Sequence, residues 1–216
     1  MQVDILCSDP KHPVNVALET WVAEQKAKHD VAILRAPAEL QGGDILFLVS
    51  CSHIITRKKR DMYRHVMVLH ASDLPKGRGW SPHVWAILEG AKQISVTLLV
   101  AEDGVDSGDI WARERLNIAP GALFDDINAS LFDAETKLMS KGIALVMNGQ
   151  SPVSQSNENA TYYRKRSPED GKLDPTQPLT ELFDQIRVAD PNRYPAYFEL
   201  HGETYTLELR KVISLE

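Results

Sequence analysis

The chain has 216 residues, of which 43% are hydrophobic and 25% are charged. A chain of this length and composition can bury the core of one ordinary domain and does not belong to the disordered class. Its formal net charge of -6 disfavours a nucleic-acid partner, because phosphate binding depends on Lys and Arg. A local basic patch still leaves RNA open as a partner.

The two cysteines, Cys7 and Cys51, lie in apolar, strand-like runs. We expect two buried thiols in a reducing compartment rather than a disulfide, and two cysteines this far apart do not form a zinc motif. The N-terminus has no basic stretch leading into an apolar one, and the run at residues 45–49 is too short to cross a bilayer. The sequence therefore favours a cytoplasmic protein without membrane contact.

Short apolar runs alternate with a helical pattern in the first third of the chain. Residues 3–7, 31–34, 45–49 and 66–69 predict strands, and a helix is predicted between about residues 14 and 25. Apolar strands that alternate with helices are typical of a parallel sheet covered on both faces. We therefore expect the α/β class, with a doubly wound, mostly parallel sheet. No Gly-x-Gly-x-x-Gly follows the first strand, so we do not expect NAD binding.

The next predicted helix begins at Pro82, with Ser81 as its cap and Gly90 at its end, and residues 94–100 read as a further strand. Asp125 and Asp126 then open a long amphipathic helix that continues to about Met147.

The last part of the chain begins with a polar stretch, residues 151–160, whose Ser and Asn content predicts a loop or linker. A short helix at residues 179–186 and a hairpin at residues 196–209, turning near His201-Gly202, are predicted after it. We therefore divide the chain into a main domain, residues 1–150, and a small C-terminal extension, residues 151–216.

The most informative stretch lies between Val68 and Trp111. It contains His70-Ala-Ser72-Asp-Leu74-Pro75-Lys-Gly-Arg78-Gly79, then Pro82, Gly90 and Val96-Thr97, and finally Asp103-Gly-Val-Asp106-Ser-Gly-Asp109. This stretch resembles the folate-dependent formyltransferases, which include the methionyl-tRNA, glycinamide ribonucleotide and sugar-nucleotide N-formyltransferases. The family pattern is Asn-x-His-x-Ser-x-Leu-Pro, then Arg-Gly, then Val-Thr and Asp-x-Gly-Asp. Asp106 stands 36 positions after His70, as the family spacing requires, and the ordered set is far more specific than any one of its members.

The resemblance implies that residues 1–150 are a formyltransferase domain that uses 10-formyltetrahydrofolate as co-substrate, without a metal or a covalent enzyme intermediate. An amine attacks the formyl carbon, and negative charge develops on oxygen. By resemblance, His70 donates a hydrogen bond to that oxygen, a type of contact worth roughly 2.7–4 kcal/mol. Asp106 orients the imidazole and takes the amine proton, directly or through water.

The sequence departs from the family pattern at Val68, where the family has a catalytic Asn. Valine cannot donate a hydrogen bond, so one contact to the oxyanion is missing or comes from Ser52, His53, Ser72 or a backbone amide. We favour a subfamily that works with His70 and Asp106 alone. The alternative is a non-catalytic protein that binds folate or a nucleotide sugar.

The resemblance also assigns binding residues. The predicted folate pocket contains Ile54, Ile55, Ala101, Asp103 and Asp106. The predicted substrate contacts of this stretch are Ser72, Lys76, Arg78 and Trp80, where Lys76, Arg78 and the adjacent glycine bind a phosphate. Each has a structural alternative: Ser72 as a turn cap, and the basic pair as an ordinary surface loop. We expect Trp85 to lie in the core and Arg57-Lys58-Lys59-Arg60 to form a solvated face.

A second resemblance lies in residues 161–171, which read Thr161-Tyr162-Tyr163-Arg164-Lys165-Arg166-Ser-Pro-Glu-Asp170-Gly171. This segment resembles the Tyr-Phe-x-Arg-Arg-x-Pro-x-Asp-Gly segment of the sugar N-formyltransferases. Arg166 is predicted to meet a substrate pyrophosphate, and Tyr162 or Tyr163 to stack on a base. The residues after 150 are too few for the barrel that methionyl-tRNA formyltransferases add, so a small substrate is expected.

The substrate predicted first is a UDP- or dTDP-linked 4-amino-deoxy sugar, and the motif block looks closest to short formyltransferases of nonulosonic (pseudaminic-type) sugar synthesis. Methionyl-tRNA or another amine is the alternative. The predicted C-terminal hairpin makes a homodimer plausible.

Overall fold

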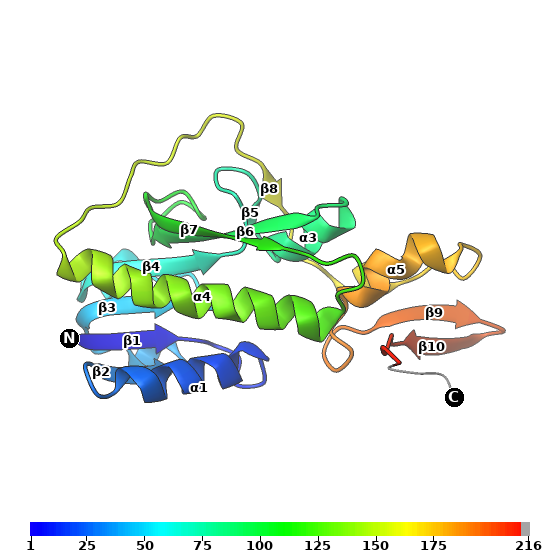
Figure 1. The fold of residues 1–216 in the computed structure, drawn as a ribbon, viewed down its shortest axis with the longest axis horizontal. Helices are drawn as coiled ribbons and strands as arrows, with labels where there is room; N and C mark the ends of the chain where they lie inside the picture. The colour runs from blue at the N-terminus through cyan, green and yellow to red at the C-terminus, as the bar shows by residue number, and fades with distance from the viewer. Residues whose placement is uncertain (213–216) are drawn as a thin grey trace.

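The computed structural model describes residues 1–212, and its centre is a six-stranded sheet with the order β2-β1-β3-β4-β6-β7 (Figure 1). The strands are β1 (Gln2–Leu6), β2 (Asp30–Leu34), β3 (Gly43–Leu48), β4 (Tyr63–His70), β6 (Gln93–Val100) and β7 (Ile110–Asn117). The neighbours from β2 to β4 are parallel, whereas β6 and β7 are antiparallel to the strands beside them. The predicted α/β class with a mostly parallel sheet is confirmed.

The strand that sequence analysis missed is β7, which forms an edge of the sheet. Its sequence, IWARERLN, carries charged residues on the face that is open to solvent. It is therefore not an apolar run, and it pairs along its length with the buried strand β6.

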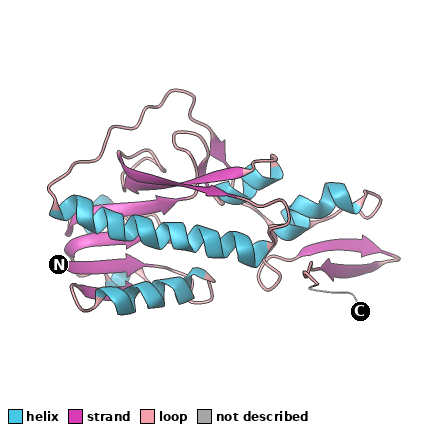
Figure 2. Cartoon of the chain, in the orientation of Figure 1, coloured by secondary structure: helices cyan, strands magenta, loops and turns pink. Residues whose placement is uncertain are grey.

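Helices α1 (Val14–Gln25) and α4 (Phe124–Met147) lie side by side on one face of the sheet (Figure 2). The apolar side chains of both helices pack against β1, β3, β4 and β6 and form the main core. Gly142 allows α4 to approach the sheet closely, because a Cβ at that position would lie 2.8 Å from a side-chain carbon of Leu98. The predicted long helix therefore continues through this glycine.

The opposite face has little helical cover. The connection from β2 to β3 holds only a 3-10 turn, Pro37–Glu39, and α2 (Arg57–Arg60) has a single turn. The solvated face predicted for residues 57–60 is only partly present. Arg60 is largely covered: it donates a hydrogen bond to the Ile55 carbonyl (2.6 Å) and pairs with Asp103.

Helix α3 (Pro82–Leu88) begins at Pro82, as predicted, and Gly90 follows its end in the left-handed region. The predicted cap at Ser81 is wrong. Ser81 has φ 48° and ψ 47°, so its side chain makes no capping hydrogen bond to the helix. Ser81 instead lies in the wall of a cavity that His70 also lines.

The polar stretch 151–160 runs as an extended loop and leads into β8 (Tyr162–Tyr163), which pairs with β5 (Arg78–Gly79). A 3-10 turn (Pro168–Gly171), α5 (Leu179–Arg187), and the hairpin β9 (Ala196–Leu200) and β10 (Glu203–Leu207) follow. The hairpin turns at His201-Gly202, as predicted. These last elements stand at one end of the molecule and share a small apolar cluster of their own (Figure 1).

The structure also tests the predictions for Trp85 and for the two cysteines. Trp85 is half-buried rather than in the core: it stacks on Tyr163 and donates a hydrogen bond to the Arg164 carbonyl. Both cysteines are free thiols, but only Cys7 is buried, whereas Cys51 is half-buried. No helix within residues 1–212 is long and apolar enough to cross a membrane.

Candidate active site

His70 is the last residue of β4, at the carboxyl end of the parallel strands, where ligands bind in open α/β sheets. Its side chain is 7% exposed. The Nε2 atom lies 2.8 Å from the carbonyl oxygen of Gly77, in the loop that follows β4. Gly77 has φ 72°, and a Cβ there would meet Ser72 and Tyr163 at 3.0 Å, so this loop depends on glycine.

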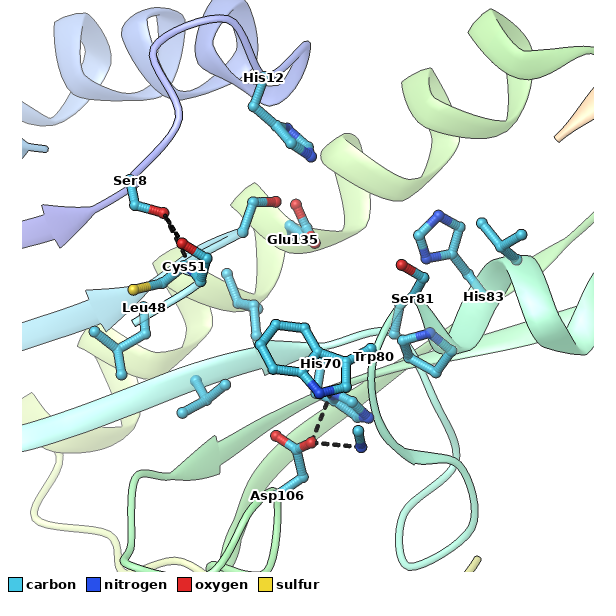
Figure 3. A pocket seen from close by; sticks show the side chains of 18 of the residues that line it. Ser8, His12, Leu48, Cys51, His70, Trp80, Ser81, His83, Asp106 and Glu135 are labelled. Carbon is cyan, nitrogen blue, oxygen red and sulfur yellow. Dashed lines mark hydrogen bonds and ion pairs between the residues drawn. The ribbon is translucent and has the colours of Figure 1, made fainter. Parts of the chain in front are cut away.

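Asp106 lies in the loop between β6 and β7 and faces His70 (Figure 3). Its Oδ2 is 3.4 Å from His70 Nδ1 and accepts a hydrogen bond of 2.9 Å from the Gly79 N–H. The Asp106 backbone is left-handed, with φ 50°. Gln155 holds this loop from the far side by donating to the carbonyl oxygens of Asp106 and Gly108.

The hydrogen bond to Gly77 fixes how His70 can act. A carbonyl oxygen only accepts, so Nε2 must carry its proton. Nδ1 then accepts when the ring is neutral and donates only when the ring is an imidazolium. The group that faces Nδ1 is the Asp106 carboxylate, 3.4 Å away. The pair thus combines an imidazole that can form hydrogen bonds with a carboxylate that can accept a proton.

A single cavity of about 660 Å³ opens onto this pair. All residues predicted to bind folate line it: Ile54, Ile55, Ala101, Asp103 and Asp106. Trp80 and Arg166, two of the predicted substrate contacts, line it as well. The cavity therefore draws its wall from both sides of position 150.

Arg60 steadies one rim of the cavity. Its guanidinium bonds to Asp103 and to the Ile55 carbonyl, and so ties together the two segments predicted to hold folate. The hydrogen bond and the positive charge of Arg60 lower the pKa of the Asp103 carboxyl. Asp103 therefore remains ionised over the whole neutral range.

Val68, where the family pattern has Asn, is half-buried, pairs with Leu48 and Leu99 in the sheet, and lines the cavity. Of the side chains suggested as its substitutes, Ser52 and His53 also line the cavity, whereas Ser72 does not. Ser52 already shares a hydrogen bond with Ser8 (3.1 Å). His53 is exposed and is the other side chain of this cavity that could take the role of the family Asn.

The prediction that Arg78 binds a substrate phosphate is wrong. Arg78 is 2% exposed, and its guanidinium donates to Gln155, to Asn157 (2.8 Å) and to the Tyr162 hydroxyl (3.0 Å). These contacts tie the 151–160 loop to β5. The basic motif residue thus serves the fold, and the adjacent Gly79 N–H is taken by Asp106.

Three other predicted substrate contacts also lie outside the main cavity. Ser72 and Lys76 line a separate pocket of about 310 Å³, and the Ser72 hydroxyl is buried without a hydrogen-bond partner among the described residues. Tyr162 is 64% exposed and is part of neither pocket. The loop after His70 turns away from the cavity between residues 72 and 78, and Ser72 and Lys76 therefore line the second pocket instead.

The polar residues of the cavity that sequence analysis missed include His12, His83, Asn128 and Glu135. Asn128 and Glu135 lie on α4 seven positions apart and hence on one face. The signal was present, because Glu135 stands between Leu131 and Leu138 on the predicted apolar side of this helix. An acidic residue on the apolar side of a helix indicates that this side borders a polar cavity.

A family model described as "Formyl transferase" matches residues 5–143. The chain belongs to the formyl transferase family. The family region includes His70, Asp106 and all five residues predicted to bind folate. Methionyl-tRNA formyltransferase from Agathobacter rectalis is 34% identical to this family member over 79% of the chain. The chain spans 55% of that relative's length, and about half the length of the other curated methionyl-tRNA formyltransferases it first matches.

Solved structures share the fold across nearly the whole chain. A methionyl-tRNA formyltransferase from Clostridium thermocellum superposes with a TM-score of 0.81 at 22% identity and covers 98% of this chain and 93% of that one. HypX from Aquifex aeolicus, solved with tetrahydrofolic acid, gives 0.83 at 19% identity, over 97% of this chain and 37% of HypX. A sugar N-formyltransferase from a Shewanella species superposes with a TM-score of 0.74 at 16% identity, and the match covers 100% of this chain and 99% of that one. At these identities the likeness shows the fold.

Proposed function

We propose that this formyl transferase family member moves the formyl group of 10-formyltetrahydrofolate to a primary amine, with residues 1–150 as the catalytic domain. The observation that carries the proposal is the buried His70–Asp106 pair, 3.4 Å apart at the mouth of one cavity. HypX, which shares the fold, was solved with tetrahydrofolic acid.

The reaction needs one donor and one proton acceptor. The amine nitrogen bonds to the formyl carbon, and the carbonyl oxygen becomes an oxyanion that a hydrogen bond from His70 stabilises. The amine proton passes to the Asp106 carboxylate. The bond between the formyl carbon and N10 then breaks, and N10 takes up the proton held by Asp106, so that a formamide and tetrahydrofolate leave and Asp106 is again a carboxylate.

The co-substrate would lie against the segments 54–55 and 101–106. A flat pterin ring binds between apolar walls with a few polar contacts. Ile55 is buried and Ile54 is 77% exposed toward the cavity side of its loop, while the 101–106 loop offers backbone groups. The Arg60–Asp103 bond would keep these walls at a fixed separation.

For the acceptor we propose a nucleotide-linked amino sugar. Arg166 lines the cavity, and its Nε is buried without a hydrogen-bond partner among residues 1–212. Arg166 is half-buried, and burial lowers its pKa although the Asp170 charge opposes this shift; a pyrophosphate oxygen would give the guanidinium a charged hydrogen-bond partner. Trp80, with the Lys165 ammonium 5.3 Å from its ring, offers an aromatic surface at the same wall.

Methionyl-tRNA is the second candidate, because the relative from Agathobacter rectalis acts by its name on methionyl-tRNA and is 34% identical to this chain. The charge balance of the sequence favours the smaller substrate. The two candidates differ in the size and charge of the acceptor and are separated by one assay.

That assay incubates the protein with 10-formyltetrahydrofolate and either UDP- and dTDP-linked 4-amino-deoxy sugars or methionyl-tRNA. Mass spectrometry of the acceptor detects the gain of one formyl group. We expect formylation of a sugar nucleotide. Formylation of methionyl-tRNA alone would reverse the choice of substrate, and consumption of neither acceptor would contradict the proposed activity with these amines.

A further inference from the structure

The second pocket, of about 310 Å³, lies beside the loop that follows β4. This loop contributes Ser72, Lys76 and Gly77 to its wall, and residues of α3, β6, β7 and β8 form the other sides. His70 and Asp106 line the main cavity but not this pocket. The second pocket is therefore a neighbour of the active site that the proposed reaction does not use.

One wall of the second pocket is a polar face of β6 and β7. Ser95 and Arg115 are register partners across these strands, so their side chains lie on the same face of the sheet. Val96 points the other way, into the core that α4 covers. Thr97 lies on the polar face and donates a hydrogen bond of 2.8 Å to the Ser72 carbonyl, which holds the loop against this face.

The Ser72 hydroxyl is buried at this pocket without a partner. Ser72 is 9% exposed, and its Oγ has no hydrogen-bond partner among residues 1–212. It lies next to Gly77, because a Cβ on that glycine would be 3.5 Å from Ser72 Oγ. A buried hydroxyl that stays unpaired is unfavourable. A ligand of the second pocket that accepts a hydrogen bond would satisfy it.

The charged residues of the second pocket favour an anion. Lys76 and Arg115 both line it, and neither forms an ion pair with a carboxylate in the described part of the chain. Asp73 lines it too, but its carboxylate is paired with Arg113 (3.6 Å). A pocket of this volume holds one small molecule. Two cations are thus available to a single ligand.

We propose that the second pocket binds a small phosphate monoester. Such a phosphate carries close to two negative charges near neutral pH and so matches the charges of Lys76 and Arg115, whereas a carboxylate brings one charge only. Its oxygens can accept hydrogen bonds from the hydroxyls of Ser72 and Ser95. The organic part of the ester lies against the ring of Tyr163, which lines the same pocket.

Gly77 joins the second pocket to the active site. Its carbonyl oxygen lies 2.8 Å from His70 Nε2, and its N–H donates a hydrogen bond of 2.8 Å to Thr161 Oγ1. A ligand held by Ser72 and Lys76 therefore binds to the loop that positions His70. The backbone amide of Gly77 should report binding directly.

The test follows backbone amides by ¹⁵N NMR while glycerol 3-phosphate is added to the full chain without folate or amine. Inorganic phosphate and glycerate, a carboxylate of similar size, are the comparison ligands. The variants are Lys76→Gln, Arg115→Gln and Ser72→Ala. Lys92→Gln is the matched control, because Lys92 is exposed and adjoins β6 but does not line the second pocket.

We expect saturable shifts of the Ser72, Gly77 and Ser95 amides in the parent protein. Lys76→Gln, Arg115→Gln and Ser72→Ala should each raise the Kd of glycerol 3-phosphate about tenfold, the loss of one hydrogen bond or contact to a charged ligand. Lys92→Gln should leave the Kd unchanged. Inorganic phosphate should bind more weakly because it leaves part of the pocket unfilled, and glycerate because it carries less charge.

Thermal melting checks that the variants fold. Ser72→Ala removes only an unpaired hydroxyl, and Lys76 and Arg115 are exposed residues. All three variants should therefore melt at the parent's temperature, so that a rise in Kd reports the loss of a contact.

The proposal is overturned if these amides show no saturable shift in the parent, if Ser72→Ala binds as tightly as the parent, or if Lys92→Gln weakens binding as much as Arg115→Gln. Equal binding of inorganic phosphate or glycerate would contradict a phosphate monoester as the ligand. Loss of binding in Arg166→Ala alone would place the phosphate in the main cavity. Because neither folate nor amine is present, a failure of formyl transfer would leave this site untouched.

Discussion

The Nε2 atom of His70 lies 2.8 Å from the carbonyl oxygen of Gly77. This contact turns Nδ1 toward Asp106 and makes a hydrogen bond from Nδ1 depend on the charged form of the ring. The two residues on which catalysis is proposed to depend are therefore coupled: Asp106 is both the proposed proton acceptor and the group that faces His70 Nδ1.

Asp106→Asn tests this coupling. We expect kcat to fall about 10²- to 10⁴-fold, the range for a lost acid–base group, because an amide cannot take the proton from the amine. The fold should survive, since Asn tolerates the left-handed backbone at this position. Steady-state kinetics and thermal melting measure both effects. Asp109→Asn, in the same loop, is the control, and an equal loss of activity in it would refute a specific role for Asp106.

Val68→Asn tests whether the cavity lacks a donor. Val68 is half-buried and lines the cavity next to His70, so an amide there would face the reacting atoms. We expect kcat to rise about tenfold, a modest part of what one oxyanion donor can supply. Val68→Leu controls for volume. A fall in kcat with Asn would mean that another group, such as His53, already occupies the oxyanion position.

Arg166 and Arg78 should respond in opposite ways to the same substitution. Arg166→Ala is expected to raise the KM of the amine substrate about tenfold or more and leave the folate KM unchanged, because Arg166 lines the cavity and its Nε has no hydrogen-bond partner among residues 1–212. Arg78→Ala is expected to cost about 2–4 kcal/mol of stability, since it breaks a buried network and releases the 151–160 loop. Kinetics and urea unfolding separate the two. Equal rises in both KM values for Arg166→Ala would count against a substrate contact.

Glu135 predicts a stability that depends on pH. Its folded-state pKa of about 8 is above its ordinary value of 4.5, so folding favours the protonated acid. Its contribution is fully present below pH 4.5 and is lost as the pH rises through 8. We therefore expect Glu135→Gln to gain stability relative to the parent between pH 4.5 and 8.5, on the order of a few kcal/mol. Urea unfolding at both pH values measures this gain. His12 and His83 titrate in both proteins and cancel, and a pH-independent difference would show that Glu135 is not buried as an acid.

The parallel strands of the sheet and the His70–Asp106 pair could be predicted from the sequence because both have local signals. The four apolar strands and the motif around His70 and Asp106 were recognisable from composition and spacing. The edge strand β7 had no such signal, because three of its eight residues are exposed and its sequence is not an apolar run. Its place in the sheet is decided by pairing with β6.

The substrate contacts were harder to predict for a different reason. Arg78 and Arg166 are both arginines in motif segments, and only packing shows that the first is buried against Gln155 whereas the second faces the cavity. The polar cavity residues that were missed, His12, His83, Asn128 and Glu135, come from three parts of the chain that are distant in sequence: the loop before α1, α3 and α4. Glu135 alone, an acid in an apolar stripe, could have been noticed from the helical pattern.

The central claim is tested most directly by His70→Gln, assayed for tetrahydrofolate formation from 10-formyltetrahydrofolate with an accepted amine. Gln cannot replace the imidazole ring that lies between Gly77 and Asp106. We predict that the parent protein transfers the formyl group and that kcat of the variant falls about 10²- to 10³-fold with folate binding unchanged. A variant that transfers formyl at the parent's rate would contradict the account.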